Sequence, residues 1–152
     1  MKYHIVTYGC QMNVHESEKI AGLLRVCGYT EEAPIEDADI VVFNTCCIRE
    51  NAENHAFGNI GALKKLKRHK KGMLIAVGGC MAQEQGKAAL LVKKFPFIDI
   101  IFGTHNVAEL PDLIARKRRE KKVVSLLEDR AETEDGAQAF RTSYPNAWVN
   151  IT

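Results

Sequence analysis

The sequence predicts an α/β domain with an open, mostly parallel sheet of four to five strands and helices on both faces. Two observations lead to this prediction. Short apolar runs of the strand type recur along residues 2–115, and each is followed by a stretch with the apolar spacing of a helix. The apolar runs contain few polar residues, as expected of strands that are buried on both faces. Such an alternation favours right-handed crossovers and the layering of Rossmann-like or flavodoxin-like folds.

Each predicted element has a local signal. Strands are expected over residues 2–8, 39–45, 73–79 and 98–102, with 123–127 as a candidate fifth. Helices are expected over residues 14–27, 50–69, 83–95 and 106–116. Asn13 and Glu16 resemble a capping box before the first helix, and Pro111 indicates that the last helix becomes regular near Leu110.

Length and composition indicate a folded globular protein. The chain has 152 residues, of which 46% are hydrophobic and 26% are charged, which excludes disorder throughout. No apolar run reaches the roughly 18 residues of a membrane span, and no secretory signal is recognisable. We therefore expect a cytoplasmic protein without a membrane partner. The net charge of +2 does not by itself indicate a polyanion ligand.

The chain is expected to contain one complete domain. Residues 1–127 are assigned to the α/β domain. Residues 128–143 are expected to form a linker, because they begin with an acidic stretch of small residues. Residues 144–152 end in a strand-like alternation that stops at the last residue, so we expect the sequence to be cut from a longer protein at the start of a further domain.

Three of the five cysteines follow predicted strands. Cys10, Cys46 and Cys80 each stand between a strand and the next helix. The carboxyl ends of parallel strands share one edge, where ligands bind, so the three thiols are expected at one rim. Nearby helix N-termini stabilise thiolates, the form that binds metals. Three thiolates without an obvious fourth ligand suit a reactive metal or cluster site better than a closed structural zinc site.

Each cysteine could instead be a packing residue without a role in metal binding. A single cysteine after a strand is most often a small buried residue, and only its recurrence in three units favours ligands. Cys27 falls on the apolar stripe of the first helix and is expected in the core. Cys47 neighbours Cys46, and because vicinal side chains diverge we expect it not to bind the same centre.

Other polar residues are expected at the same rim. A fourth ligand could come from His15, His55 or His105. Hydrogen bonds to a cluster or a substrate could come from Asn13, Asn44, Thr45, His105 and Asn106. Asparagine is equally the expected capping and turn residue. Gly9, Gly78 and Gly79 would allow the backbone to approach a bulky group closely.

Two basic runs hold 12 of the 21 positive residues. Residues 64–71 contain six Lys or Arg, and residues 116–122 contain another six. Both runs lie at predicted helix C-termini, where cations are favoured by the helix dipole. They are either solvated helix ends or contacts for nucleic-acid phosphates.

Five segments in order resemble the N-terminal domain of radical-SAM methylthiotransferases, closest to the MiaB type. They are Thr-Tyr-Gly-Cys-Gln-Met-Asn at 7–13, Ser-Glu-Lys-Ile-Ala-Gly at 17–22, Asn-Thr-Cys at 44–46 with Arg49-Glu50, Gly-Gly-Cys-Met-Ala-Gln at 78–83, and Gly-Thr-His-Asn at 103–106. The resemblance covers residues 2–115 and continues through 144–152, which looks like the start of a truncated radical-SAM domain. The sequence departs from the pattern at Cys47, where a small residue such as serine is expected.

The resemblance implies an iron–sulfur enzyme. Cys10, Cys46 and Cys80 would bind an auxiliary [4Fe–4S] cluster that carries the sulfur for the substrate. A second [4Fe–4S] cluster and S-adenosylmethionine would belong to the following radical-SAM domain, and a TRAM domain would bind RNA. The implied reaction adds sulfur and a methyl group at C2 of N6-isopentenyladenosine 37 in the anticodon stem-loop of tRNA. The chain alone, which lacks the radical-SAM motif, is expected to be inactive.

Two other kinds of function compete with this one. The chain could be a non-catalytic zinc-binding or RNA-binding α/β module. It could also belong to a related methylthiotransferase that acts on a ribosomal protein or on threonylcarbamoyl-adenosine in tRNA.

Overall fold

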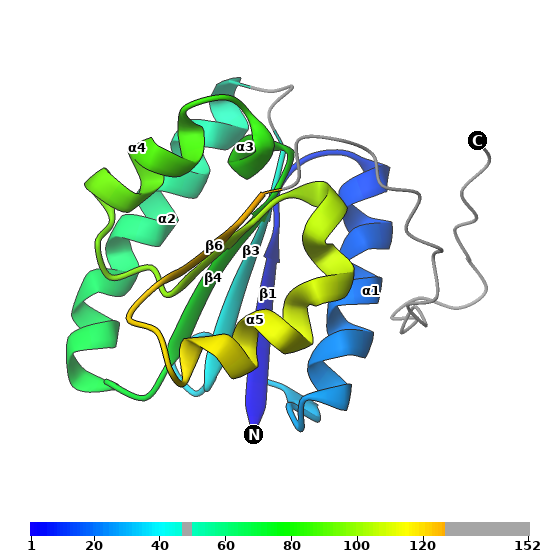
Figure 1. Ribbon diagram of the computed structural model, residues 1–152, viewed down its shortest axis with the longest axis vertical. Helices are drawn as coiled ribbons and strands as arrows, with labels where there is room; N and C mark the ends of the chain where they lie inside the picture. Colours follow the sequence, from blue (N-terminus) through cyan, green and yellow to red (C-terminus); the bar gives the residue numbers. More distant parts are fainter. Residues whose placement is uncertain (47–49, 127–152) are drawn as a thin grey trace.

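In the part of the chain that the structure describes, six parallel strands form a single sheet. The structure is a computed structural model that describes residues 1–46 and 50–126 (Figure 1). The strands are β1 (Lys2–Thr7), β2 (Glu31–Glu32), β3 (Ile40–Thr45), β4 (Leu74–Gly79), β5 (Ile100–Phe102) and β6 (Val123–Ser125). Their order is β2-β1-β3-β4-β5-β6, and each neighbouring pair is parallel. The predicted parallel α/β architecture is therefore confirmed.

Helices cover both faces of the sheet, as Figure 1 shows. The helices are α1 (Gln11–Val26), α2 (Glu50–His69), α3 (Cys80–Gln83), α4 (Lys87–Lys94) and α5 (Leu110–Lys117), and a 3₁₀ helix, η1, spans Thr104–Glu109. α1 and α5 lie on one face, and α2, α3 and α4 lie on the other. Within the described residues, none of the helices combines the length and the apolarity that crossing a membrane requires.

The central strands divide the apolar residues between two cores. All six residues of β3 are buried. Ile40 and Val42 pack beneath α1 and α5, whereas Val41 and Phe43 pack beneath α2, α3 and α4. This alternation follows from the two-residue period of a strand. Each such side chain contributes roughly 1.5–3 kcal/mol by leaving water, so β3 anchors both layers and holds the end of the strand in place.

Three local expectations differ from the structure. The first helix begins at Gln11 rather than Val14, because Cys10 is its N-cap and Asn13, inside the first turn, accepts the Cys10 backbone N–H in a capping box. The helix expected over 83–95 is interrupted between α3 and α4, where Gly86 adopts a left-handed conformation with φ of +80°. The sheet also includes β2, whose two exposed glutamates pair with Lys2 and Tyr3 through the backbone.

Other boundaries agree closely with the prediction. α2 spans the predicted residues 50–69, and α5 begins at Leu110 with Pro111 in its first turn. The candidate strand over 123–127 is present as β6. The linker assigned to 128–143, the further domain assigned to 144–152 and Cys47 lie outside the described residues.

Candidate metal centre

The three candidate cysteines come from the ends of three neighbouring strands. Cys10 is the N-cap of α1 after β1, Cys46 follows β3 directly, and Cys80 begins α3 after β4. These strands stand side by side in the order β1-β3-β4. The ends of these strands therefore share the carboxyl edge of the sheet, at the upper end of Figure 1.

Two glycines let these turns approach one another. Gly9 has a φ of +129°, and a Cβ there would lie 2.5 Å from the Cβ of Cys46. Gly79 has a φ of +96°, and a Cβ there would lie 2.2 Å from the carbonyl oxygen of Thr45. No side chain tolerates such distances, and only glycine adopts these φ values readily. The first and third cysteine-bearing turns are thus packed against the end of β3.

The three thiols differ in exposure. Cys10 is exposed, Cys80 is half-buried and Cys46 is buried, with 2% of its surface accessible. The Cys10 backbone N–H donates to Oδ1 of Asn13 over 3.2 Å, and its thiol donates to the same oxygen over 3.6 Å. Asn13 therefore determines the shape of the turn that presents the exposed thiol.

The predicted rim residues on β3 and α1 form a buried polar network. Nδ2 of the fully buried Asn44 donates to the Asn13 carbonyl oxygen over 2.8 Å and to Oγ of Ser17 over 3.0 Å. The Thr45 hydroxyl donates to the Gly78 carbonyl oxygen over 2.7 Å. These side chains lie at the rim, but their hydrogen bonds join the end of β3 to α1 and to the end of β4. This is the capping and turn role that the sequence left open.

The candidate histidines are spread over three helices. His15 is buried in α1, His55 is exposed on α2 and His105 is half-buried in η1. Asn106 is fully buried, and its amide donates to Oγ of Ser125 over 3.2 Å. Among residues 1–46 and 50–126, no three His, Cys, Asp or Glu side chains are grouped so that they could hold one metal ion.

An iron–sulfur cluster requires a wider spacing of its ligands than a single metal ion does. Each thiolate of an iron–sulfur cluster binds a separate iron, so the thiolates stand farther apart than the ligands of a single ion. The donor set suits such a group in its chemistry, because three thiols follow three neighbouring strands. Gly9 and Gly79 let the first and third of their turns pack against the end of β3. Cys27 is half-buried beside the core under α1, and burial raises the pKa of its thiol. It lies at the other end of α1 from the three candidates.

Two residues of this region were not predicted as site residues. Oγ of Ser17 accepts a hydrogen bond from the Asn44 amide and shares a second one with Oγ1 of Thr7, which lies 2.7 Å away. Burial raises the pKa of Glu16 to about 7, although Lys19 and a hydrogen bond with Asn44 oppose this shift. The sequence contains one signal for Ser17, which follows Asn13 by one helical turn and therefore lies on the same helix face.

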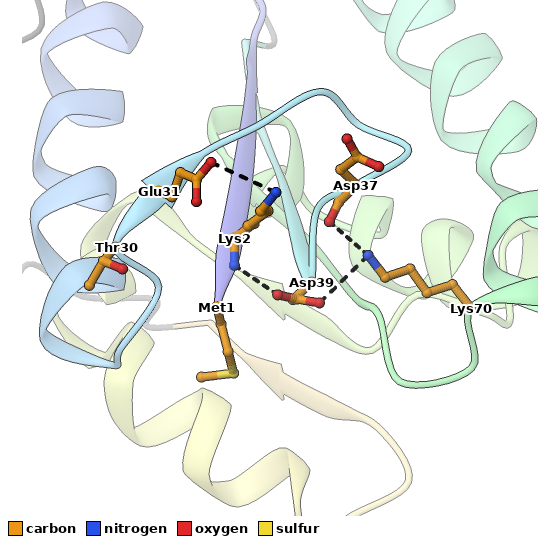
Figure 2. A pocket seen from close by; sticks show the side chains of 7 residues that line it. All are labelled: Met1, Lys2, Thr30, Glu31, Asp37, Asp39 and Lys70. Atoms are coloured by element: carbon orange, nitrogen blue, oxygen red, sulfur yellow. Dashed lines mark hydrogen bonds and ion pairs between the residues drawn. The ribbon is translucent and has the colours of Figure 1, made fainter.

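A pocket of about 460 Å³ lies at the opposite, amino edge of the sheet (Figure 2). Lys2 Nζ lies 3.7 Å from a Glu31 carboxylate oxygen, and Lys70 Nζ lies 3.5 Å from Oδ1 of Asp39. The Lys2 backbone N–H also donates to Asp39 over 2.8 Å, which lowers the pKa of that carboxyl group, and Lys70 acts in the same direction. Because these charges pair with one another, the cysteine rim is the better candidate site.

Comparison with known proteins identifies the family of this chain. Residues 2–103 match the family described as "Uncharacterized protein family UPF0004". The match covers more than half of the chain, and the chain belongs to this family. The resemblance to methylthiotransferases is also confirmed by individual relatives.

Three relatives carry the same name, tRNA-2-methylthio-N(6)-dimethylallyladenosine synthase. The relative from Caldicellulosiruptor saccharolyticus is 48% identical over 98% of this chain and 32% of its own length. The Clostridium tetani relative is 45% identical over 98% of this chain and 33% of its own length. The Mycolicibacterium smegmatis relative is 46% identical over 99% of this chain and 29% of its own length. The chain thus spans about a third of the length of these relatives.

Proposed function

We propose that this chain is the auxiliary-cluster domain of a tRNA methylthiotransferase and that Cys10, Cys46 and Cys80 hold a [4Fe–4S] cluster. The observation that carries the proposal is the close approach of the Cys10 and Cys80 turns to the end of β3, which Cys46 follows, and Gly9 and Gly79 make this approach possible. The names of the relatives support the reaction class.

The residues of the chain would contribute in distinct ways. Cys10 is the N-cap of a helix of 16 residues and would supply the most exposed of the three thiols. The buried Cys46 would be the ligand that directly follows the fully buried strand β3, and Asn13 would hold the Cys10 turn in position. When bound, the cluster would supply an open coordination position for the sulfur that is transferred. Backbone N–H groups of the turns would be the natural partners for the cluster sulfurs.

The substrate we propose is N6-isopentenyladenosine 37 in the anticodon stem-loop of tRNA, with sulfur and a methyl group added at C2. The names of the relatives favour it over a ribosomal protein or threonylcarbamoyl-adenosine. A second [4Fe–4S] cluster, S-adenosylmethionine and RNA-binding contacts would come from radical-SAM and TRAM domains outside this chain. The enzyme would work in the cytoplasm, where thiols stay reduced.

Anaerobic reconstitution of the chain with iron and sulfide tests the cluster. We expect about four irons per chain in the wild type, by the formula of the cluster, together with its visible absorption. Cys10→Ala, Cys46→Ala and Cys80→Ala should each lose the iron. Cys27→Ala and Cys47→Ala are the matched controls and should retain it. Uptake of zinc alone, or an unchanged iron content in all five variants, would falsify the cluster assignment.

The substrate is tested with the full-length protein. We expect methylthiolation of isopentenylated tRNA and none of tRNA that lacks the isopentenyl group. Modification of a ribosomal protein instead would show that the substrate assignment is wrong, whatever the iron analysis gives.

A further inference from the structure

Two basic segments meet at the amino edge of the sheet, opposite the cysteine rim. Residues 64–71 include the last turn of α2 and the loop after it, and residues 116–122 include the end of α5 and the turn before β6. Figure 1 shows both helices ending toward the lower side of the molecule, where β1 begins. The segments lie far apart in the sequence and come from helices on opposite faces of the sheet.

One buried carboxylate joins the two segments. Nζ of Lys67 lies 2.5 Å from Oδ2 of Asp99, and Nζ of Lys117 lies 3.4 Å from Oδ1. Asp99 is 7% exposed, and its Oδ2 also accepts the backbone N–H of Ile75 over 2.9 Å. Asp99 also acts electrostatically on Lys122, whose pKa burial lowers. The ends of α2 and α5 are therefore held next to each other.

The inward lysines are used by the fold. Lys67 and Lys117 bind Asp99. Lys70 Nζ donates to the carbonyl oxygens of Asp37 and Ala38, which lie 2.8 Å away. Figure 2 shows the Lys70 side chain reaching toward Asp37 in the loop before β3. Seven further cations point into solvent: Lys64, Lys65, Arg68, Lys71, Arg118, Arg119 and Lys121. Across residues 1–46 and 50–126, none of these seven forms an ion pair with a carboxylate. We call these seven residues the basic edge.

We propose that the basic edge binds the phosphate backbone of RNA, at a place separate from the cysteine rim. The inference rests on the proposed function, because that function makes a tRNA the partner. Lysine and arginine contacts to phosphates need no particular base sequence. A protein partner would need an apolar centre, and no large apolar side chain that is exposed belongs to either basic run.

The separation of the two sites defines the role of the basic edge. A strand of six residues is about 20 Å long, so the basic edge lies roughly that far from the three cysteines. Side chains at this distance cannot touch the reacting base. They can hold a distant part of the same RNA and so orient it on the domain.

The test compares two double variants of the full-length protein. Lys65→Gln with Lys121→Gln removes two charges from the basic edge. Lys93→Gln with Lys94→Gln removes two exposed charges from α4 and is the matched control. Binding of a labelled tRNA and of a 20-base-pair RNA duplex is measured by fluorescence anisotropy at several potassium chloride concentrations.

We expect the basic-edge variant to bind both RNAs more weakly, by on the order of tenfold at low salt. The slope of log affinity against log salt should become shallower by about two, because two phosphates are no longer neutralised by the protein. The control variant should stay within about twofold of the wild type. Equal losses in the two variants would reveal a general effect of net charge and overturn the proposal, as would unchanged affinity in the basic-edge variant.

Iron analysis of the same variants separates this proposal from the proposed function. The basic-edge variant should keep its full iron content. Cys10→Ala should lose auxiliary iron and keep its affinity for the RNA duplex. If the basic-edge variant lost affinity for polyglutamate while its RNA affinity was unchanged, the partner would be an acidic protein and the RNA assignment would be wrong.

Discussion

Gly79 is the residue at the cysteine rim that tolerates substitution least. Gly79→Ala would place a Cβ 2.2 Å from the Thr45 carbonyl oxygen, in a backbone conformation that is also strained. We expect a loss of more than about 2 kcal/mol in the free energy of unfolding, measured with urea. Gly86→Ala is the control, because φ is +80° there but no atom lies within 4 Å. In this control variant the free energy of unfolding should fall by only about 1 kcal/mol, because the strained backbone conformation is the sole cost. Equal losses would show that close packing of the turns is unimportant.

Glu16 makes the stability of the chain depend on pH. Its pKa is about 7 in the folded state, raised from 4.5 chiefly by burial. Between these values the folded chain holds a proton that the unfolded chain has released. The free energy of unfolding should therefore be highest below pH 4.5, as far as Glu16 is concerned, and should fall as pH rises to 7. The loss should reach at most about 3 kcal/mol.

Urea unfolding at pH 5 and pH 8 measures this effect. Glu16→Gln should reduce the difference between the two pH values, and it should be more stable than the wild type at pH 8. The exposed Glu36 offers a control, since Glu36→Gln should leave the difference unchanged. If Glu16→Gln kept the full pH dependence of the wild type, a titratable group other than Glu16 would be its cause.

At the scale of the elements, Asp99 joins the ends of α2 and α5. Asp99→Asn keeps an oxygen for the Ile75 N–H but removes the charge that Lys67 and Lys117 share. We expect thermal unfolding to show that the free energy of unfolding falls by about 1–3 kcal/mol, because Asp99 and its two lysine partners are largely shielded from water. Glu120→Gln breaks the exposed ion pair with Arg116 and should lower the free energy of unfolding by less than about 0.5 kcal/mol. If both variants lost equally little, Asp99 would not organise this edge.

Long elements with a strong apolar pattern were predictable from the sequence. β3 and β4 have nearly continuous buried runs, and α2 keeps its apolar period across the whole predicted range. β2 was not predictable, because its two glutamates are exposed and only their backbone joins the sheet. The break before α4 had a signal in Gly86, but the apolar spacing on both sides concealed it.

At the scale of the whole molecule, the edge that carries the three cysteines followed from one rule of parallel sheets. Strand ends that carry Cys10, Cys46 and Cys80 had to share an edge. The strand order β1-β3-β4 and the contacts of Gly9 and Gly79 could not be predicted, because they depend on how the turns pack in three dimensions. The same holds for Asp99, whose two lysine partners are separated by about a third of the chain.

If Cys10, Cys46 and Cys80 hold the proposed cluster, its binding should stabilise the whole domain, because the three ligands follow three different strands. A cluster that binds only the folded chain stabilises it by mass action, by about 2.7 kcal/mol at a hundredfold excess over the dissociation constant. For a domain of this size that corresponds to a rise in Tm of roughly 5–10 °C. Thermal unfolding under anaerobic conditions, before and after reconstitution, measures this rise.

Two variants locate the origin of this stabilisation. Cys46→Ala should abolish the rise in Tm because it removes the ligand on the central strand, whereas Cys27→Ala should retain it. A chain that takes up its full iron content without any change in Tm would hold that iron outside the folded sheet. In that case the approach of the Cys10 and Cys80 turns to the end of β3 would serve packing alone, and the cluster assignment would lose its structural basis.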